Sequence, residues 1–225
     1  MISIIIPTYN ERGNISSLVD KIEKELKLLK ETAEVIFVDD NSLDLTWKLI
    51  QAMARKKKFV KLIKRKGKLG LTSAILEGLK KSRGDKIIIM DADLSHPVEK
   101  LSDIAYTLNS FDLVVMSRFV PGGGVKHWPI HRKLISFGAT FLSKIILGVK
   151  GSDPMSGFFG IRKASIKGIK FKTKGYKVLL NLLVSKKKLK IKELPYVFQD
   201  RYKGETKLGN HEILIYLRDI LSLRR

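Results

Sequence analysis

Apolar and polar residues alternate along the first part of the chain in blocks that predict a strand, a helix and a second strand. Ile2 to Ile6 is a short β-branched run that ends at Pro7, which favours a buried strand over a helix. Leucine and isoleucine then recur at helical spacing, with Asn14 as the expected N-cap. These helical positions are Leu18, Ile22, Leu26 and Leu29. A second buried run, Val35 to Val38, completes one β-α-β unit.

The same alternation continues beyond this unit. Strands are expected near Val60 to Ile63 and at Ile87 to Met90, and helices near Thr46 to Ala54 and from about Leu71 to Lys81. Strands that alternate with helices predict an α/β fold, with a Rossmann-like, mostly parallel sheet flanked by helices. In such a sheet the ligands bind at the carboxyl ends of the strands.

The alternation breaks down in the second half of the chain. After a fifth strand at Leu113 to Met116, a glycine-rich loop at Gly122 to Gly124 precedes a helix from about Ile130 to Leu147. Further strands are expected at Gly157 to Ile161 and Leu189 to Val197, and helices near Tyr176 to Val184 and His211 to Leu223. No linker-like stretch divides the 225 residues, so we predict a single domain over 1–225 with unlike halves, 1–117 and 118–225.

Composition narrows the classes of protein that the chain can represent. It has no cysteine, which excludes disulfides, thiolate zinc sites and a cysteine nucleophile and fits a reducing compartment. No apolar run approaches the ~20 residues of a membrane span, and the N-terminus lacks the features of a signal peptide. We therefore expect a cytoplasmic protein without a transmembrane segment.

The positive charge is concentrated in one region. The net charge is +22, and Lys144 to Lys192 holds 14 Lys/Arg against one acid, Asp153. Nucleic acid, an anionic membrane surface and a phosphorylated substrate are all partners that such a region can attract. A solvated, lysine-rich surface is the alternative, and charge alone does not choose among them.

Two carboxylates directly follow the fourth predicted strand. Asp91 and Asp93 lie on the same side of an extended chain, where both can approach one hard cation. Mg²⁺ or Mn²⁺ suits such a pair, because these ions take oxygen ligands and complete their shells with substrate phosphates. The alternative is an acidic turn or a helix cap without a ligand.

Other polar side chains follow the first two strands. Asp39 and Asp40 can accept hydrogen bonds from a nucleobase or ribose, although Asp39, Asn41 or Ser42 can also cap the next helix. The Pro7 to Glu11 segment adds an aromatic ring and another acid to the same crevice. Neither Gly-x-Gly-x-x-Gly nor Gly-Lys-Ser/Thr occurs, which disfavours dehydrogenases and ordinary kinases. A metal and basic side chains would have to neutralise a diphosphate.

Taken in order, these segments resemble the family-2 glycosyltransferases and, within them, the dolichyl-phosphate mannose synthases. The resemblance covers nearly the whole chain. Its motifs are Pro7-Thr8-Tyr9-Asn10-Glu11, Val38-Asp39-Asp40-Asn41-Ser42, Asp91-Ala92-Asp93-Leu94-Ser95-His96-Pro97, Ser117-Arg118, Trp128-Pro129, Arg132-Lys133-Leu134-Ile135-Ser136, Ser156-Gly157-Phe158-Phe159 and Arg201-Tyr202-Lys203-Gly204-Glu205-Thr206-Lys207-Leu208.

The resemblance implies a GT-A fold and a role for each matching residue. The residues implied to bind the nucleotide-sugar are Pro7, Tyr9, Glu11, Val38, Asp40, Asp91, Ala92, Asp93, Arg118 and Lys207. Those implied to bind the acceptor phosphate are Arg118, Arg132, Ser136, Arg201 and Lys203. Asp91 and Asp93 would bind the metal. Some relatives carry Gln where this chain has Ser95, so Ser95 or a water molecule would supply the third ligand. Asp93, Arg118 and Arg132 would be the catalytic residues.

The implied reaction is inverting transfer of mannose from GDP-mannose to dolichyl (polyprenyl) phosphate. UDP-glucose or another nucleotide-sugar is the alternative donor. A non-enzymatic basic module that binds anionic membrane or nucleic acid is a more distant alternative, which leaves the acids at the strand ends unexplained. We expect no nucleic-acid partner. The reaction does not require His96 or His127 as a proton-transfer group.

The resemblance also raises the question of how the chain reaches a lipid acceptor. Many relatives continue into membrane-spanning helices, whereas this sequence ends at Arg225. We expect peripheral binding to an anionic membrane through the basic second half, with a membrane partner subunit as another route. The apolar residues of the terminal helix that are expected to insert are Tyr216, Leu217, Ile220 and Leu221. The alternative is that this helix packs on the sheet.

Overall fold

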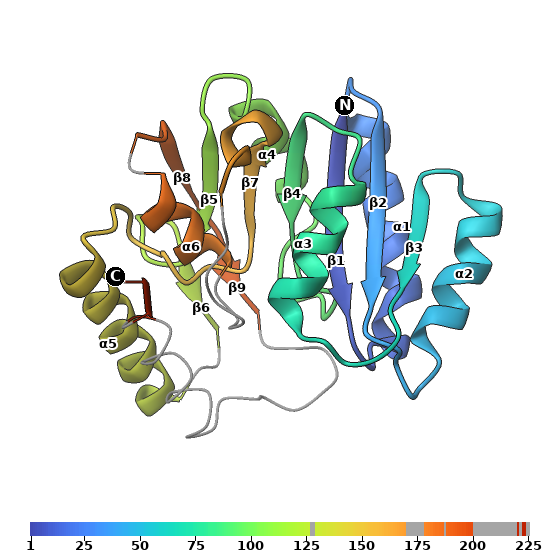
Figure 1. Ribbon diagram of the computed structural model, residues 1–225, viewed down its shortest axis with the longest axis horizontal. Coiled ribbons are helices and arrows are strands. Elements are labelled where there is room, and N and C mark those ends of the chain that lie inside the picture. Colours follow the sequence, from blue (N-terminus) through green and yellow to red (C-terminus); the bar gives the residue numbers. More distant parts are fainter. Residues whose placement is uncertain (127–128, 170–177, 187, 200–219, 221, 224–225) are drawn as a thin grey trace.

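The computed structural model describes residues 1–126, 129–169, 178–186, 188–199, 220 and 222–223. A seven-stranded sheet forms its centre, and helices cover both faces of this sheet (Figure 1). The strands are β1 (Ile2–Thr8), β2 (Ala33–Asp39), β3 (Val60–Lys64), β4 (Lys86–Ile89), β5 (Leu113–Ser117), β7 (Phe159–Arg162) and β8 (Ile191–Pro195). The helices are α1 (Arg12–Leu28), α2 (Thr46–Lys56), α3 (Leu71–Lys81), α4 (Lys100–Thr107), α5 (Ile130–Leu147) and α6 (Val178–Ser185). Two short strands, β6 (Gly124–Val125) and β9 (Val197–Phe198), pair apart from the main sheet.

The strand order is β3-β2-β1-β4-β7-β5-β8. Strands β3, β2, β1 and β4 are parallel neighbours, and β5 is parallel to β8. Strand β7 runs antiparallel to both β4 and β5, between the two parallel groups. The mostly parallel sheet is therefore confirmed, and the single antiparallel strand is a feature that the hydrophobic pattern did not indicate.

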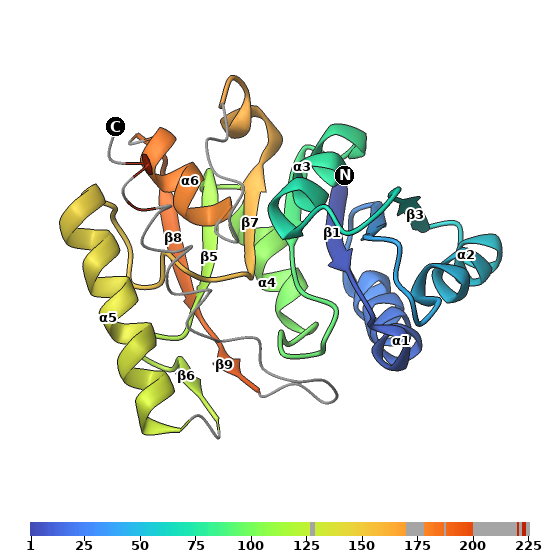
Figure 2. The same cartoon turned by 60° about the horizontal axis from the view of Figure 1, so that its bottom comes forward.

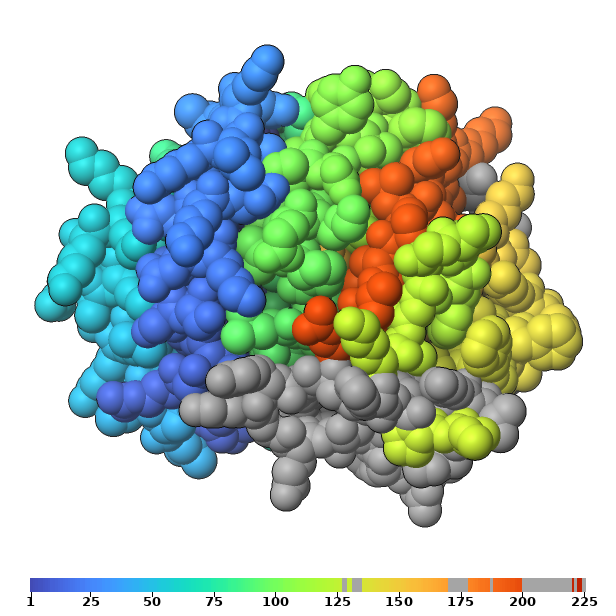
Figure 3. Space-filling view, turned by 180° about the vertical axis from the view of Figure 1, so that it is seen from behind, coloured from blue at the N-terminus to red at the C-terminus, as the bar shows by residue number. Residues whose placement is uncertain are grey.

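Both halves of the chain contribute strands to this one sheet, and β7 of the second half lies between β4 and β5 of the first half. Figure 3 shows the surface from behind, with the N-terminal part of the first half in blue and the second half in yellow-green to orange at the other end. That the two halves form one domain, with different functions, stays a prediction.

The sheet is buried on both faces, and β1 shows why. Ile2, Ile4 and Ile6 pack into one core cluster, whereas Ile5 packs into the other. Residues of α1, α2 and α4 complete the first cluster, and residues of α3, α5 and α6 complete the second. Figure 2 separates α1 and α4 on one side of the sheet from α3 and α6 on the other. A strand buried on both faces has no polar face, which explains the continuous apolar run.

Several element boundaries differ from the sequence expectations. Helix α1 begins at Arg12 with Glu11 as its N-cap, so Asn14 is not the cap. Asn14 lies inside the helix instead, where its Nδ2 donates to Glu11 Oε2 at 2.8 Å. Helix α4 was not predicted. Helices α3 and α5 have the predicted bounds.

The terminal segment also requires a correction. Ile220 and Leu223 are 1% and 6% exposed and belong to the second core cluster, so Ile220 is not available to insert into a membrane. Tyr216, Leu217 and Leu221 lie outside the described residues. Within the part of the chain that the structure describes, no helix is both long and apolar enough to cross a bilayer.

A buried carboxylate on β2 makes the stability of this fold dependent on pH. Glu34 accepts hydrogen bonds from Ser3 Oγ at 2.6 Å and Arg83 N at 2.7 Å, and it pairs with Lys61. Burial by itself raises the pKa of Glu34, but these donors outweigh it and lower the pKa from 4.5 to about 2.

We expect the melting temperature to fall as the pH is lowered from about 4.5 towards 2, because a carboxyl with a lowered folded-state pKa loses its contribution over that range. Glu34→Gln retains the side-chain shape without the charge, so its melting temperature should be lower at neutral pH and should change less with acid. Circular dichroism at several pH values measures both effects. The exposed Glu99→Gln variant is the control, and equal pH dependence of Glu34→Gln and the wild type would contradict the assignment.

Candidate active site

The loops that follow β1, β2 and β4 each contain a residue with left-handed backbone. The φ angles of Asn10, Asn41 and Leu94 are 58°, 56° and 62°. Asparagine tolerates this conformation, but leucine rarely adopts it. Strain of this kind persists only where the surrounding structure imposes it, and it is concentrated at functional sites. The loops at the carboxyl edge of the sheet are therefore the candidate functional site.

Side-chain hydrogen bonds tie the first two of these loops together. Asn10 N donates to Ser42 Oγ at 2.9 Å, and Leu43 N donates to Asn10 Oδ1 at 3.0 Å. Pro7 and Val38 are paired in register on the neighbouring strands β1 and β2. The structure thus brings the Pro7 to Glu11 and Val38 to Ser42 segments to one edge, as the sequence predicted.

Asp39 is fully buried and serves to shape its loop. Its carboxylate accepts hydrogen bonds from Thr8 Oγ1 at 2.9 Å, Ser42 Oγ at 2.6 Å and Ser42 N at 2.8 Å. The N-cap of α2 is Leu45, so none of Asp39, Asn41 and Ser42 caps that helix, and this alternative interpretation is wrong. Asp39 instead closes the turn that presents the next residue, Asp40.

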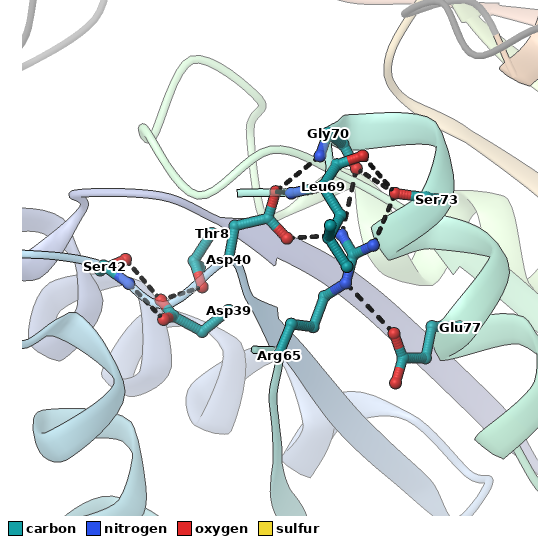
Figure 4. A network of polar contacts seen from close by, with 9 residues as sticks. All are labelled: Thr8, Asp39, Asp40, Ser42, Arg65, Leu69, Gly70, Ser73 and Glu77. Atoms are coloured by element: carbon teal, nitrogen blue, oxygen red, sulfur yellow. Dashed lines mark hydrogen bonds and ion pairs between the residues drawn. The ribbon is translucent and has the colours of Figure 1, made fainter. Parts of the chain in front are cut away.

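Asp40 lies at the centre of a polar network that joins β2, β3 and α3 (Figure 4). Its Oδ2 accepts hydrogen bonds from Leu69 N at 3.0 Å and Gly70 N at 2.8 Å, and its Oδ1 accepts one from Arg65 Nη1. Arg65 follows β3 and also donates from Nη2 to Ser73 Oγ at 2.6 Å. A carboxylate has roughly four acceptor positions, so most of those on Asp40 are used within the protein.

The loop between β3 and α3 also reaches the first strand. Lys68 Nζ lies 4.4 Å from the centre of the Tyr9 ring, a cation-π contact. Glu11 N donates to Thr46 Oγ1 at 3.0 Å, which links the start of α1 to α2. Residues 65–70 are therefore neighbours of Tyr9 and Asp40. Sequence reasoning missed them, because no motif of the resemblance falls in this loop.

Asp91 and Asp93 follow β4 at the same edge and differ in exposure. The Asp91 side chain is 37% exposed, whereas Asp93 is only 4% exposed. Asp93 Oδ1 accepts hydrogen bonds from Ser95 Oγ at 2.5 Å and Ser95 N at 3.1 Å. In the structure Ser95 therefore orients Asp93, and a role for Ser95 as a metal ligand remains a prediction.

His96 holds this acidic loop against the core. Its Nδ1 accepts a hydrogen bond from Asp91 N at 3.0 Å, and its ring stacks on Phe158 at 4.9 Å. Burial, and then the charge of Arg118, lower the pKa of His96 to about 4, although Asp93 and Asp153 act in the opposite direction. The imidazole is therefore neutral at physiological pH, with its proton on Nε2. Its contacts indicate a positioning residue.

Gly157 lets the segment before β7 approach the acidic loop closely. A Cβ at this position would lie 3.3 Å from Asp91 Oδ2 and 3.5 Å from His96 Cε1. Ser156 fixes the same segment, because its Oγ donates to Met116 O at 2.7 Å. A larger residue at position 157 would displace the Asp91 carboxylate.

The acidic loop fits a cation that receives much of its coordination from a substrate. Among the described residues, no group of three or more His, Cys, Asp and Glu side chains could enclose a metal. Asp91 and Asp93 supply hard oxygen donors, which suit Mg²⁺ or Mn²⁺ when phosphates and water complete the shell. A closed structural metal site does not fit these residues.

Arg118 follows β5 and forms a buried, bidentate ion pair with Asp153. Nε and Nη2 of Arg118 donate to the two Asp153 carboxylate oxygens at 2.7 and 2.8 Å. Burial lowers the pKa of Arg118, but its hydrogen bonds to Asp153 outweigh that effect and raise it. Glu193 on β8 supports the pair, because its Oε1 accepts hydrogen bonds from Ser152 N at 2.8 Å and Asp153 N at 3.1 Å. Sequence reasoning did not assign roles to Asp153 and Glu193.

The other predicted acceptor residues are described in part. Arg132 and Ser136 lie one turn apart on α5. Three predicted site residues, Arg201, Lys203 and Lys207, lie outside the described part of the chain. His127 and Trp128 also lie outside it.

The Asp40 network predicts a strong thermodynamic coupling. Arg65→Met would leave the buried Asp40 carboxylate without its cation, and we expect the free energy of unfolding to fall by about 3 to 5 kcal/mol. In Asp40→Asn/Arg65→Met no buried charge remains, so the double variant should lose less than the two single variants together. Urea unfolding measures all three, with Arg55→Met on the exposed side of α2 as the control. Strict additivity would show that the two side chains do not act as a pair.

Known proteins are similar to this chain in sequence and in fold. Residues 3–169 match the model of Glycosyl transferase family 2. The dolichol-phosphate mannosyltransferase of Pyrococcus furiosus is 41% identical over 229 residues, which cover 100% of this chain and 64% of that protein. The dolichol-phosphate mannosyltransferase of Saccharomyces cerevisiae is 34% identical over 232 residues, which cover 98% of this chain and 86% of that protein. The chain thus spans less than two thirds of the length of the Pyrococcus furiosus relative.

Two solved structures show the same fold at low sequence identity. Glucosyl-3-phosphoglycerate synthase from Mycobacterium tuberculosis, in complex with Mn²⁺, UDP and glucosyl-3-phosphoglycerate, is 20% identical with a TM-score of 0.68, covering 99% of this chain and 78% of that one. A mannosyltransferase from Pyrobaculum calidifontis, in complex with GDP-Man and Mn²⁺, is 18% identical with a TM-score of 0.66, covering 99% and 62%. These likenesses confirm the predicted fold. Because the family model matches most of the chain, the protein belongs to glycosyl transferase family 2.

Proposed function

We propose that the protein transfers mannose from GDP-mannose to dolichyl or another polyprenyl phosphate, with inversion at the anomeric carbon. The observation that carries the proposal is the position of Asp91 and Asp93, at the same sheet edge as the Tyr9 and Asp40 loops. Relatives named dolichol-phosphate mannosyltransferase support the donor sugar and the acceptor. Turnover assays with GDP-mannose and UDP-glucose, each with dolichyl phosphate, test the proposal and its alternative donor.

The first half of the chain would bind the donor. Tyr9 and Asp40 would contact the nucleoside, with Pro7, Glu11 and Val38 around it. A Mg²⁺ or Mn²⁺ ion on Asp91 and Asp93 would neutralise negative charge on the departing diphosphate. The hydrogen bonds from Ser95 pre-orient Asp93, which reduces the reorganisation that donor binding requires.

The second half would bind the acceptor phosphate. A phosphate monoester is already anionic near neutral pH, since its second pKa is about 6, so the acceptor oxygen needs little help from a general base. Arg118, Arg132 and Ser136 would orient it, with Arg201, Lys203 and Lys207 closing over the phosphates. Arg118 keeps its charge in the buried pair with Asp153. His96 is neutral and turned towards the backbone of Asp91, which agrees with a mechanism based on positioning and charge.

The location that follows from this reaction is the cytoplasmic face of a membrane, with the protein bound peripherally. Its acceptor lies in a bilayer, and the chain carries a net charge of +22. A membrane partner subunit could strengthen this attachment.

The metal assignment predicts that turnover stops in EDTA and returns when Mg²⁺ or Mn²⁺ is added. In Asp93→Ala we expect turnover to fall by roughly 100-fold or more, because one carboxylate cannot hold the ion in the geometry that the diphosphate needs. Asp103→Ala, an acid on α4 away from the site, should retain activity. Circular dichroism should show a folded protein in both variants. Unchanged turnover of the purified wild type in EDTA would contradict the assignment.

The division between donor and acceptor residues predicts that Arg132→Ala weakens use of the acceptor far more than binding of the donor. Loss of a charge-assisted hydrogen bond costs about 1.5 to 3 kcal/mol, or about 10- to 150-fold in the KM or dissociation constant for the acceptor. Separate titrations of dolichyl phosphate and GDP-mannose measure the two effects. Lys133→Ala removes the same charge at the next position and is the matched control. Equal losses for donor and acceptor would show that Arg132 does not belong to the acceptor side.

A further inference from the structure

Helix α5 exposes a row of large apolar side chains to solvent. Ile130, Phe137, Phe141 and Ile145 are 77%, 56%, 66% and 64% exposed. They recur at helical spacing, so they form one stripe, which we call the α5 stripe. At 1.5 Å per residue it is about 22 Å long. Other exposed apolar side chains, such as Leu28 on α1 and Tyr106 on α4, occur singly, which is normal for a protein surface.

The opposite side of the same helix packs on the protein. Ala139, Leu142 and Ile146 contact the second core cluster and point roughly opposite to the stripe. A helix that is apolar on both sides is typical of one that is buried on both sides. In Figure 1, α5 lies at the outer edge of the molecule, beyond the last strand of the sheet. The position and the exposure of the stripe indicate that it meets an apolar surface outside this chain.

The charge of the chain segment that contains the stripe indicates which kind of surface the stripe fits. No acid occurs between Asp112 and Asp153, and every charged side chain in that interval is basic. These residues are Arg118, Lys126, Arg132, Lys133, Lys144 and Lys150. A second copy of this chain would bring the same positive charge to the contact, which disfavours self-association. An anionic bilayer offers both an apolar layer and negative headgroups.

We propose that the α5 stripe enters the interface of an anionic membrane while the adjacent Lys and Arg side chains bind its headgroups. The inference builds on the proposed function, since a lipid acceptor requires contact with a bilayer. It assigns the contact to α5 in place of the terminal helix, where Ile220 is buried in the core.

The stripe also leads to the proposed acceptor site. Phe137 packs on Phe119 with ring centres 4.7 Å apart. Phe119 directly follows Arg118, whose guanidinium carbon lies 5.1 Å from the Phe119 ring centre. A membrane that receives the stripe would therefore place its headgroup layer near Arg118. This arrangement allows a lipid phosphate to reach the protein while its chain stays in the bilayer.

A single label tests where the protein enters the membrane. The chain has no cysteine, so Ile145→Cys and Leu28→Cys each give one position for a polarity-sensitive fluorophore. Both original side chains are exposed, at 64% and 73%. On addition of phosphatidylcholine-phosphatidylglycerol vesicles, the label at position 145 should shift to the blue and the label at position 28 should not. No shift at position 145, or equal shifts at both positions, would overturn the proposal.

A pair of double variants measures the contribution of the stripe to binding. In Phe141→Gln/Ile145→Gln we expect vesicle binding at high salt to weaken by about tenfold or more, because the apolar part of binding resists salt. Leu28→Gln/Tyr106→Gln removes the same number of exposed apolar side chains elsewhere and should bind as the wild type does. Sedimentation with the same vesicles measures binding, and circular dichroism checks folding. Equal binding by the two variants would overturn the proposal. Light scattering that shows a dimer for the wild type and a monomer for Phe141→Gln/Ile145→Gln would also overturn it, because the stripe would then be a contact between two copies.

Activity separates this inference from the proposed function. With a short, water-soluble prenyl phosphate, the stripe variant should turn over GDP-mannose as the wild type does, whereas with vesicle-embedded dolichyl phosphate it should be slower. If the wild type shows no turnover with any polyprenyl phosphate, the proposed function fails, and the vesicle experiments still decide the role of the stripe. If turnover with both acceptors is the same in the variant and the wild type, the stripe does not deliver the site to the lipid.

Discussion

Burial of the central strands on both faces is the constraint on which the rest of the structure depends. Strand β1 sends Ile4 into one core and Ile5 into the other, so it has no face left for polar chemistry. Buried polar side chains on β1 and β2 are confined to the strand ends. Ser3 pairs with Glu34 at the amino end, where the contact stabilises the fold, and Thr8 pairs with Asp39 at the carboxyl end. The polar residues proposed to bind the donor therefore lie in the loops at the carboxyl edge.

The acids at that edge serve different purposes, which their exposure reveals. Asp39 is fully buried, and its hydrogen bonds hold the loop in shape. Asp40 is shared between Arg65 and the start of α3, so a ligand that uses it meets a carboxylate already fixed in position. Asp91 is the most exposed of these acids, with its backbone held by His96. Hydrogen bonds hold this loop in shape, and the Asp91 carboxylate remains accessible, as a site that shares a cation with its substrate requires.

The sequence predicted the features that depend on local pattern and missed those that depend on tertiary contacts. The bounds of α3 and α5 are marked by Gly70, Pro129 and Gly148, residues that are common at helix ends. Strand direction leaves no mark on an apolar run, so antiparallel β7 was not foreseen. Arg65 is one of many basic residues, and only the fold shows that it meets Asp40. Asp153 did carry a detectable signal in the sequence, because it is the single acid in a long basic segment. The structure shows that its partner is Arg118.

The distribution of charge follows the proposed division of labour. Residues 1–117 hold 20 Lys/Arg and 16 acids, whereas residues 118–225 hold 24 and 6. The donor half therefore retains the carboxylates that a metal requires, and its excess positive charge is small. The second half leaves most of its positive charge without an acid to balance it, which costs stability through self-repulsion. An acceptor phosphate at Arg118 and anionic headgroups around α5 would relieve that repulsion. The same charges can then serve both to bring the protein to the membrane and to orient the phosphate that reacts.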